Sequence, residues 1–416
     1  MAAFVYTAVV AVIGDGLSLV ALLPWLGLLL VGLADIFMSM RRSGQIDVDA
    51  PAEVFVGEDL TVSLRDTGAR PGQRLRVNLP DGLAGLTEAR FNADGTAALT
   101  LNAKRRGTWA IAHVWLLWPS QLGLFEFIPK LPLGGDVRVV PNIRLVQSGA
   151  LTAKVMSTLI GVKENRAIGE GSEFHQLREF VSGMDVKSID WKRSARNRML
   201  LGKELRAERN HHVILAVDAG FLMREEIGGL AKIDHAVTAA LAVAWSATVG
   251  GDLIGHFSYD VQPRTFAKPM AGRGAFVRMR SWAAEIDYVA RETNHTLALS
   301  ELNARTPKRS LIIIFTDFVD TTSAELMLEN IAILAKRHLI VFVAIRDPDI
   351  DDRLTAAPDT MSDVATLVAV NQSISERRLV LERLNRMGAT VVDAKPEHIT
   401  GRLIATYLDI KERELI

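Results

Sequence analysis

VILAVDAG, residues 213–220, is the stretch of this chain that decides the fold. An uninterrupted apolar run leads into Asp218 and Gly220, without the polar alternation of a strand exposed on one side. A short run of this kind indicates a strand buried on both faces, as in parallel sheets covered by helices. Similar runs recur towards the C-terminus.

Apolar strands and helical segments alternate over residues 212–416. Residues 233–251 predict a helix that carries small and apolar residues around most of its surface and stops at Gly250-Gly251. Thr322-Ser323-Ala324-Glu325 predicts the start of another helix, with a capping box. Strands joined by helical crossovers predict a Rossmann-like α/β domain with a mostly parallel sheet and helices on both faces. Its other strands are expected at DLIGHFSYD (252–260), SLIIIFTDF (310–318), LIVFVAI (339–345) and ATVVDA (389–394).

Residues 46–142 predict a small antiparallel β-sandwich domain. Leu60, Val62 and Leu64 alternate with polar residues, a period of two that indicates one buried face. Turn sequences such as Pro80-Asp81-Gly82 separate the runs. Short strands at such spacing are typical of a sandwich. We expect its heavy core residues to be Trp109, Ile111, Val114 and Trp115.

Residues 1–42 predict a membrane anchor of one or two helices. The apolar run 17–38 is long enough to cross the ~30 Å hydrocarbon core of a bilayer, whereas the run 2–13 is short for that. Arg41 and Arg42 follow directly, and the positive-inside rule then places the rest of the chain in the cytoplasm. A signal peptide fits less well, because no basic segment precedes the apolar run and basic rather than small residues follow it.

The composition excludes several functional classes. The 48 Lys and Arg residues equal the 48 Asp and Glu residues in number, so no overall charge favours nucleic acid. No cysteine is present for disulfides, thiolate catalysis or zinc–thiolate sites, and neither a Gly-x-Ser-x-Gly nor a His-Glu-x-x-His sequence occurs. Asp218 and Asp317 follow two of the predicted strands, and sites of open α/β sheets form where the strands end.

A segment between the two predicted domains carries a resemblance to a known family. Residues 169–198, GEGSEFHQLREFVSGMDVKSIDWKRSARNR, combine glycines, aromatic residues and both signs of charge. Within them, GMDVKSIDW (183–191) is similar to the Gly-Asp-Asp-x-Arg-x-Ile-Asp-Trp core of the bacterial family called domain of unknown function fifty-eight. Residues 104–125 and 387–392 also resemble stretches of that family in type and order. The resemblance implies two N-terminal membrane helices, a β domain, a signature linker over 143–211 and a von Willebrand A-like domain over 212–416.

The resemblance also implies a site. A von Willebrand A domain holds a divalent ion at the strand ends with an Asp-x-Ser-x-Ser loop, a threonine from a second loop and an aspartate from a third. Here the first loop reads DAGFL (218–222), which lacks both serine hydroxyls; Asp317 matches the third loop, and Thr293 or Thr296 is the nearest threonine. Since Mg²⁺ prefers about six oxygen ligands, we expect a degenerate site at Asp218 and Asp317, for which Mg²⁺ is the one cofactor to consider.

Arg178, Asp185, Asp190, Trp191 and Arg196 are the candidate interaction residues of the signature segment. The arginines can form bidentate pairs with the two aspartates, and the tryptophan can wedge the segment against the sheet. Such a set clamps the β and α/β domains together, or else offers a docking surface to a partner.

The resemblance implies a function as well, namely partnership with a MoxR-type AAA+ ATPase in assembling or activating other protein complexes. We therefore expect an adaptor in the bacterial inner membrane that faces the cytoplasm and binds proteins, without nucleic acid and without enzymatic activity of its own. A metal-dependent hydrolase using Asp218 and Asp317 and a purely structural membrane scaffold remain as alternatives.

Overall fold

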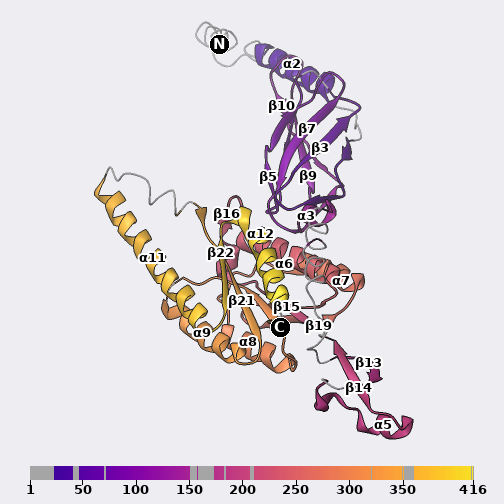
Figure 1. Cartoon of the computed structure of the whole chain (residues 1–416). Coiled ribbons are helices and arrows are strands. Elements are labelled where there is room, and N and C mark those ends of the chain that lie inside the picture. Colours follow the sequence, from indigo (N-terminus) through magenta and orange to yellow (C-terminus); the bar gives the residue numbers. More distant parts are fainter. Residues whose placement is uncertain are drawn as a thin grey trace. The chain divides into compact units, whose positions relative to one another are not determined.

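The computed structural model describes residues 23–40, 46–69, 72–149, 157, 173–181, 184–206, 210–319, 321–348, 350, 360–413 and 415. The chain divides into two compact units, Met1–Val140 and Pro141–Ile416 (Figure 1).

In the described residues of the first unit, β-strands form three sheets. One has the order β1-β3-β7-β5, the second β10-β9-β4-β6 with β11 also on β9, and the third β2-β12-β8. Every pairing is antiparallel except that of β2 with β12. The strands are β1 (Ile46–Asp49), β2 (Glu53–Phe55), β3 (Asp59–Asp66), β4 (Arg74–Val77), β5 (Leu83–Gly85), β6 (Glu88–Arg90), β7 (Thr96–Ala103), β8 (Gly107–Ala110), β9 (His113–Pro119), β10 (Glu126–Phe127), β11 (Lys130–Pro132) and β12 (Asp136–Val140).

The period of two seen in the sequence sets the core of this unit. Leu60, Val62 and Leu64 of β3 are buried, as the alternation predicts. The expectation for Trp115 is wrong, because on β9 the buried side chains are Val114, Leu116 and Trp118, and Trp115 falls on the opposite face. There the ammonium of Lys130 lies 5.6 Å from the centre of its ring. Trp109 is likewise only half-buried, while Ile111 and Val114 are in the core as expected.

Helix α2 (Leu23–Ser39) precedes the strands and is apolar except at its end. Asp35 and Ser39 are buried, and they accept hydrogen bonds from the backbone N–H groups of Leu122 (3.0 Å) and Gln121 (2.9 Å), which ties the helix to the loop after β9. Among the residues that the structure describes, no helix is both long and apolar enough to span a bilayer. The run 2–13, the first part of the run 17–38 and the two arginines at 41–42 lie outside those residues.

The second unit contains the predicted mostly parallel sheet. Its strand order is β19-β18-β15-β20-β21-β22, the order 3-2-1-4-5-6 of a doubly wound fold. All neighbours are parallel except the edge strand β19, which is antiparallel to β18. The bounds are β15 (His212–Asp218), β18 (Leu253–Tyr259), β19 (Pro263–Met270), β20 (Leu311–Phe315), β21 (Leu339–Ile345) and β22 (Thr390–Ala394).

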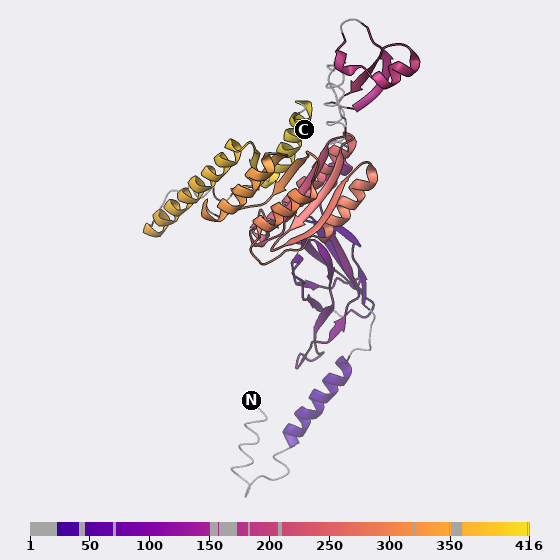
Figure 2. The ribbon, with the colours of Figure 1, turned by 90° about the horizontal axis from the view of Figure 1, so that it is seen from below.

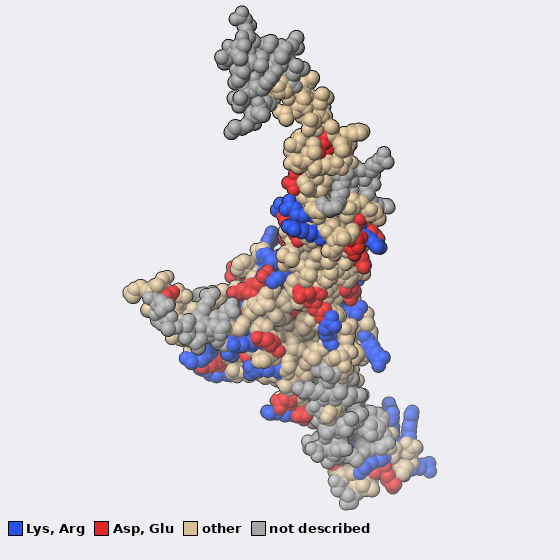
Figure 3. Space-filling view, turned by 90° about the horizontal axis from the view of Figure 1, so that it is seen from above, with Lys and Arg blue, Asp and Glu red and all other residues tan. Residues whose placement is uncertain are grey.

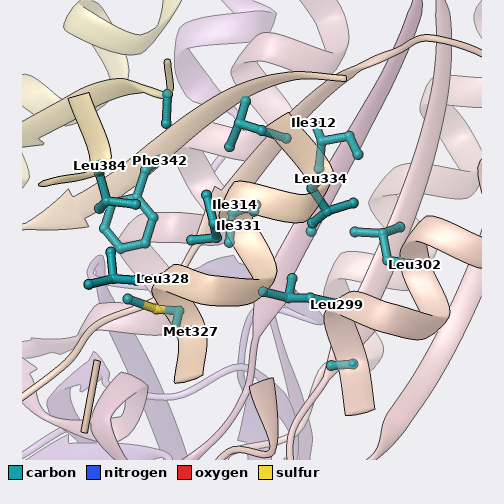
Figure 4. Packing of buried hydrophobic residues seen from close by; sticks show 14 of the residues in the cluster. Leu299, Leu302, Ile312, Ile314, Met327, Leu328, Ile331, Leu334, Phe342 and Leu384 are labelled. Carbon is teal, nitrogen blue, oxygen red and sulfur yellow. The ribbon is translucent and has the colours of Figure 1, made fainter. Parts of the chain in front are cut away.

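Helices cover both faces of this sheet (Figures 1 and 2). On one face α6 packs against α7 and α12, and on the other α9 packs against α8 and α11. Figure 4 shows the second layer, where Leu299, Met327, Leu328 and Leu384 close over Phe342 and the isoleucines of β20. The bounds are α6 (Lys232–Val249), α7 (Arg273–Glu285), α8 (His295–Arg305), α9 (Thr321–Ala335), α11 (Met361–Arg386) and α12 (Pro396–Glu412).

Candidate functional site at the carboxyl edge of the sheet

Asp218 and Asp317 lie at the carboxyl edge, the side of the sheet where its parallel strands end. Asp218 is the last residue of β15, and Asp317 comes two residues after the neighbouring strand β20. Both line one cavity of about 730 Å³, together with residues 290–296 and the start of α9. The strands bring the two acids together because their buried apolar runs pair in parallel and end at the same level.

Asp218 is fully enclosed by hydroxyl and amide donors. Its Oδ1 accepts hydrogen bonds from Thr293 Oγ1 (2.6 Å) and from the Gly220 backbone N–H (2.8 Å), and its Oδ2 accepts one from Thr316 Oγ1 (2.6 Å). Burial raises the pKa of this carboxyl, against the lowering effects of His295 and the hydrogen bonds. The three donors to this carboxylate are uncharged, so they bind its oxygens but supply no positive charge against it.

His295 and Tyr259 extend this buried polar group. Burial lowers the pKa of His295 and raises that of Tyr259, so both side chains are held neutral. In the described part of the chain, Tyr259 Oη and His295 Nδ1 have no hydrogen-bond partner. The groups around Asp218 are therefore buried and uncharged.

Asp317 has an opposite environment. Its Oδ2 accepts from Lys232 Nζ at 2.5 Å, and its Oδ1 accepts from Arg377 Nη1 at 2.8 Å and from the Phe318 backbone N–H at 2.9 Å. Burial would raise the pKa of this carboxyl, but the charges of Arg377 and Lys232 hold it below its usual value. Asp317 is thus an ionised, buried carboxylate compensated by two cations.

The two cations come from the helices on opposite faces. Lys232 is the first residue of α6 and is itself buried, and its ammonium also binds Glu225. Arg377 lies in the middle of α11, where its guanidinium stacks 5.4 Å from the centre of the Phe318 ring and reaches Asp393 Oδ1 at 3.2 Å. Burial opposes both charges, yet Asp317 raises the pKa of each of them.

These residues do not fit a divalent ion. A Cβ added at Gly220 would lie 1.9 Å from Thr293 Oγ1, so the backbone leaves no room for a serine while Thr293 is bonded to Asp218. The Lys232 ammonium sits on Asp317, where the metal would need that carboxylate. In the described ranges, no group of three or more His, Cys, Asp or Glu side chains is arranged to hold a metal.

Sequence reasoning found the acids and missed their partners. Thr293, one of the two candidate threonines, does lie against Asp218, whereas Thr296 contacts Asn330 of α9 instead. Thr316, Lys232 and Arg377 were not predicted. A basic residue at the first turn of an otherwise small and apolar helix was the one available signal for Lys232.

Exposed apolar side chains surround the edge. Phe221, Val319 and Leu326, which we call the apolar rim, are 59%, 58% and 61% exposed. All three line the 730 Å³ cavity, and the first two also line a second cavity of about 580 Å³ beside Asp317. Large exposed apolar groups gathered around buried charges are typical of a binding surface.

The signature segment forms a small hairpin. Strands β13 (Glu173–Glu179) and β14 (Leu201–Arg206) pair antiparallel, with helix α5 (Trp191–Asn197) between them. The predicted arginine–aspartate pairs are wrong: Asp185 accepts from the Lys187 backbone N–H, and Asp190 caps α5 through the Arg193 backbone N–H. Lys203 forms an ion pair with Asp190, at 3.7 Å.

Three other candidates of this segment lie at its surface. Trp191 is 65% exposed at the start of α5, which contradicts the prediction that it wedges the segment in place. Arg178 on β13 and Arg196 on α5 are also exposed. The structure thus explains Asp185 and Asp190 by backbone capping, because short turns leave N–H groups that an aspartate satisfies.

The sheet order and the two acids at the strand ends define a Rossmann-like α/β domain with a candidate binding site at its carboxyl edge. The chain belongs to the family described as protein of unknown function DUF58, whose model matches residues 176–386, half of the chain. The uncharacterized proteins Rv1480 of Mycobacterium tuberculosis and Mb1516 of Mycobacterium bovis are each 25% identical over 182 residues, which are 43% of this chain and 56% of theirs. The chain therefore spans about half the length of these curated relatives.

Solved structures with partial similarity include a matrix protein from the mussel byssus. Proximal thread matrix protein 1 from the mussel byssus, with a zinc-occupied MIDAS motif, has a TM-score of 0.31 and 10% identity over 49% of this chain and 46% of its own. A second crystal form of the same mussel protein has a TM-score of 0.30 and 9% identity over 48% of this chain and 45% of its own. The zinc belongs to the mussel protein.

Proposed function

We propose that this protein is a membrane-anchored adaptor that binds a protein partner at the carboxyl edge of a von Willebrand A-like domain. The observation that carries the proposal is the apolar rim of Phe221, Val319 and Leu326 around an edge whose two acids are already satisfied. The partner that the family resemblance implies is a MoxR-type AAA+ ATPase, and the expected outcome is assembly or activation of other complexes.

The contacts of the two acids favour binding over catalysis. A metal-dependent hydrolase using Asp218 and Asp317 would need carboxylate oxygens free for an ion, but those of Asp317 are bound by Lys232 and Arg377. Those of Asp218 accept three short hydrogen bonds. A general base also has to reach its substrate, and Asp218 is 2% exposed.

The membrane part of the proposal rests on helix α2. Leu28, Leu29 and Leu30 are each more than half exposed, and at about 100° per residue they point to different sides of one helix. The surface that Figure 3 shows for α2 is largely free of charged side chains. Beside the helix, the β-unit loop adds the exposed side chains of Leu122, Leu124, Phe125 and Ile128. A continuous apolar surface of this kind favours lipid as its surroundings.

Capture of the detergent-solubilised protein from its own cells, with ATP and Mg²⁺, tests the adaptor proposal. We expect an AAA+ ATPase to be recovered with the wild type and to be lost with Phe221→Ser at the rim. Val277→Ser is the matched control, because Val277 is similarly exposed (56%) but lies on α7 outside both cavities. Recovery of no ATPase, together with phosphoester or peptide turnover that Asp218→Asn abolishes, would favour the hydrolase instead.

A further inference from the structure

The second cavity at the carboxyl edge, of about 580 Å³, has an excess of positive charge. Arg224, Lys232 and Arg377 line it, against the carboxylates of Glu225 and Asp317. Arg377 also reaches Asp393, but Asp393 has a second cationic partner in Arg346, at 3.1 Å. Among the residues that the structure describes, one positive charge in the lining is therefore left without a counter-charge.

Two of these cations keep a donor unused. The Nε–H groups of Arg224 and Arg377 are shielded from solvent, and in the described part of the chain neither has a hydrogen-bond partner. A buried N–H without an acceptor is costly, and native proteins rarely leave two in one place. Both arginines line the same cavity, and an oxyanion bound there could satisfy these donors.

We propose that this cavity binds the carboxylate of an aspartate or glutamate side chain of the protein partner. A carboxylate matches the planar guanidinium groups, and its single negative charge matches the single excess positive charge. A phosphate group, with nearly two negative charges, would be repelled by Glu225 and Asp317. The identity of the partner as a protein rests on the adaptor function proposed above.

The apolar walls of the cavity indicate which residue types flank that acid in the partner. Phe221, Leu222, Val319, Ile350 and Ile374 line the rest of it, and the first and third belong to the apolar rim. An acidic residue flanked by apolar ones would place its charge on the arginines and its neighbours against this wall. In this arrangement, the cationic side chains at the carboxyl edge bind the acid of the partner, where a metal ion would otherwise do so.

The test uses the full chain in detergent and two short peptides, acetyl-Leu-Glu-Leu-amide and acetyl-Leu-Gln-Leu-amide, with inorganic phosphate as a third probe. The arginine Nε–H signals are followed by NMR and assigned with Arg224→Lys and Arg377→Lys. We expect the glutamate peptide to shift both signals and to bind about tenfold more tightly than the glutamine peptide, since each charge-assisted pair is worth about a factor of ten.

Variants separate the cavity from general surface charge. Arg224→Gln is expected to weaken the glutamate peptide about tenfold without breaking any ion pair of Asp317, and Ser373→Asp at the exposed rim of the cavity should weaken it as well. Arg378→Gln, one residue beyond Arg377 on α11 and 73% exposed, is the matched control and should have no effect. Equal binding of both peptides, tighter binding of phosphate, or unshifted signals would overturn the proposal.

Failure of this inference and failure of the adaptor function give different results. If an ATPase is captured equally well by the wild type and by Arg224→Gln, the adaptor stands and the acid pocket is wrong. If the glutamate peptide binds as expected but no protein partner is captured, the pocket stands as a carboxylate site and the adaptor function falls.

Discussion

Asp218 and Asp317 end neighbouring strands of one sheet and are almost equally buried, at 2% and 3% exposed, yet their surroundings are opposite. Asp218 is held by two threonine hydroxyls and an amide, and Asp317 by a lysine and an arginine. Burial alone would raise the pKa of both carboxyls, so the difference comes from the partners. The comparison teaches that the type of donor, and not the depth of burial, decides in which direction the pKa of each acid is shifted.

The two acids contribute to stability with opposite dependence on pH. Asp317 has a folded-state pKa below its unfolded value, so its contribution is present above the unfolded value and is lost as the pH falls through the folded one. Asp218 has a raised folded-state pKa, so its contribution is present at low pH and is lost as the pH rises through that pKa. Substitution of each acid tests this contrast.

The largest effect is expected from Asp317→Ala. It leaves the buried Lys232 and the half-buried Arg377 without their shared counter-ion, and removal of one partner of a buried ion pair costs about 3–5 kcal/mol. Urea unfolding of the purified chain at neutral pH measures the loss. Glu301→Ala, which breaks a surface pair with Arg305 on α8, should cost less than about 1 kcal/mol. Equal losses in the two variants would contradict the ion-paired description of Asp317.

The sequence correctly predicted the strands that form this edge of the sheet. The apolar runs around residues 213, 312 and 341 are long enough and uniform enough to indicate buried parallel strands, and the sheet contains them as expected. The position of Asp218 and Asp317 at the ends of their strands followed from the same pattern, because parallel strands end on one side. Local pattern was sufficient for these features.

The partners of the acids could not be predicted, because they depend on contacts between segments far apart in the chain. Lys232 and Asp317 are 85 residues apart, and Arg377 lies another 60 beyond Asp317. The alternation of β9 likewise did not tell which face is buried, and the tryptophan at 115 was placed on the wrong one. In the signature segment, the residue types suggested arginine–aspartate pairs. The two aspartates instead accept hydrogen bonds from backbone N–H groups two and three residues away, which orders fewer side-chain bonds than pairing with a long arginine would.

An intermediate effect is expected from Gly220→Ser, which restores one hydroxyl of the metal loop implied by the resemblance. The new Cβ would collide with Thr293 Oγ1, so Thr293 has to leave Asp218, and overpacking of this kind costs about 1–3 kcal/mol. Thermal unfolding with and without Mg²⁺ should give the same lowered midpoint. Gly401→Ser on α12, where a Cβ meets nothing within 4 Å, should be close to neutral. A rise of the midpoint in Mg²⁺ would show that the Asp218 half of the edge can still accept an ion.

The smallest effect, and the one that distinguishes the two acids most sharply, is expected from Asp218→Asn. An amide has the same shape and can keep the bonds from Gly220 and Thr293, so the loss at neutral pH should stay below about 1 kcal/mol. Relative to the variant, the wild type should lose stability as the pH rises above the ordinary carboxyl value of 3.8, until the folded-state pKa of Asp218 is passed. Unfolding free energies of both proteins across this pH range measure the difference. A difference that grows in favour of the wild type with rising pH would mean that Asp218 is ionised like Asp317.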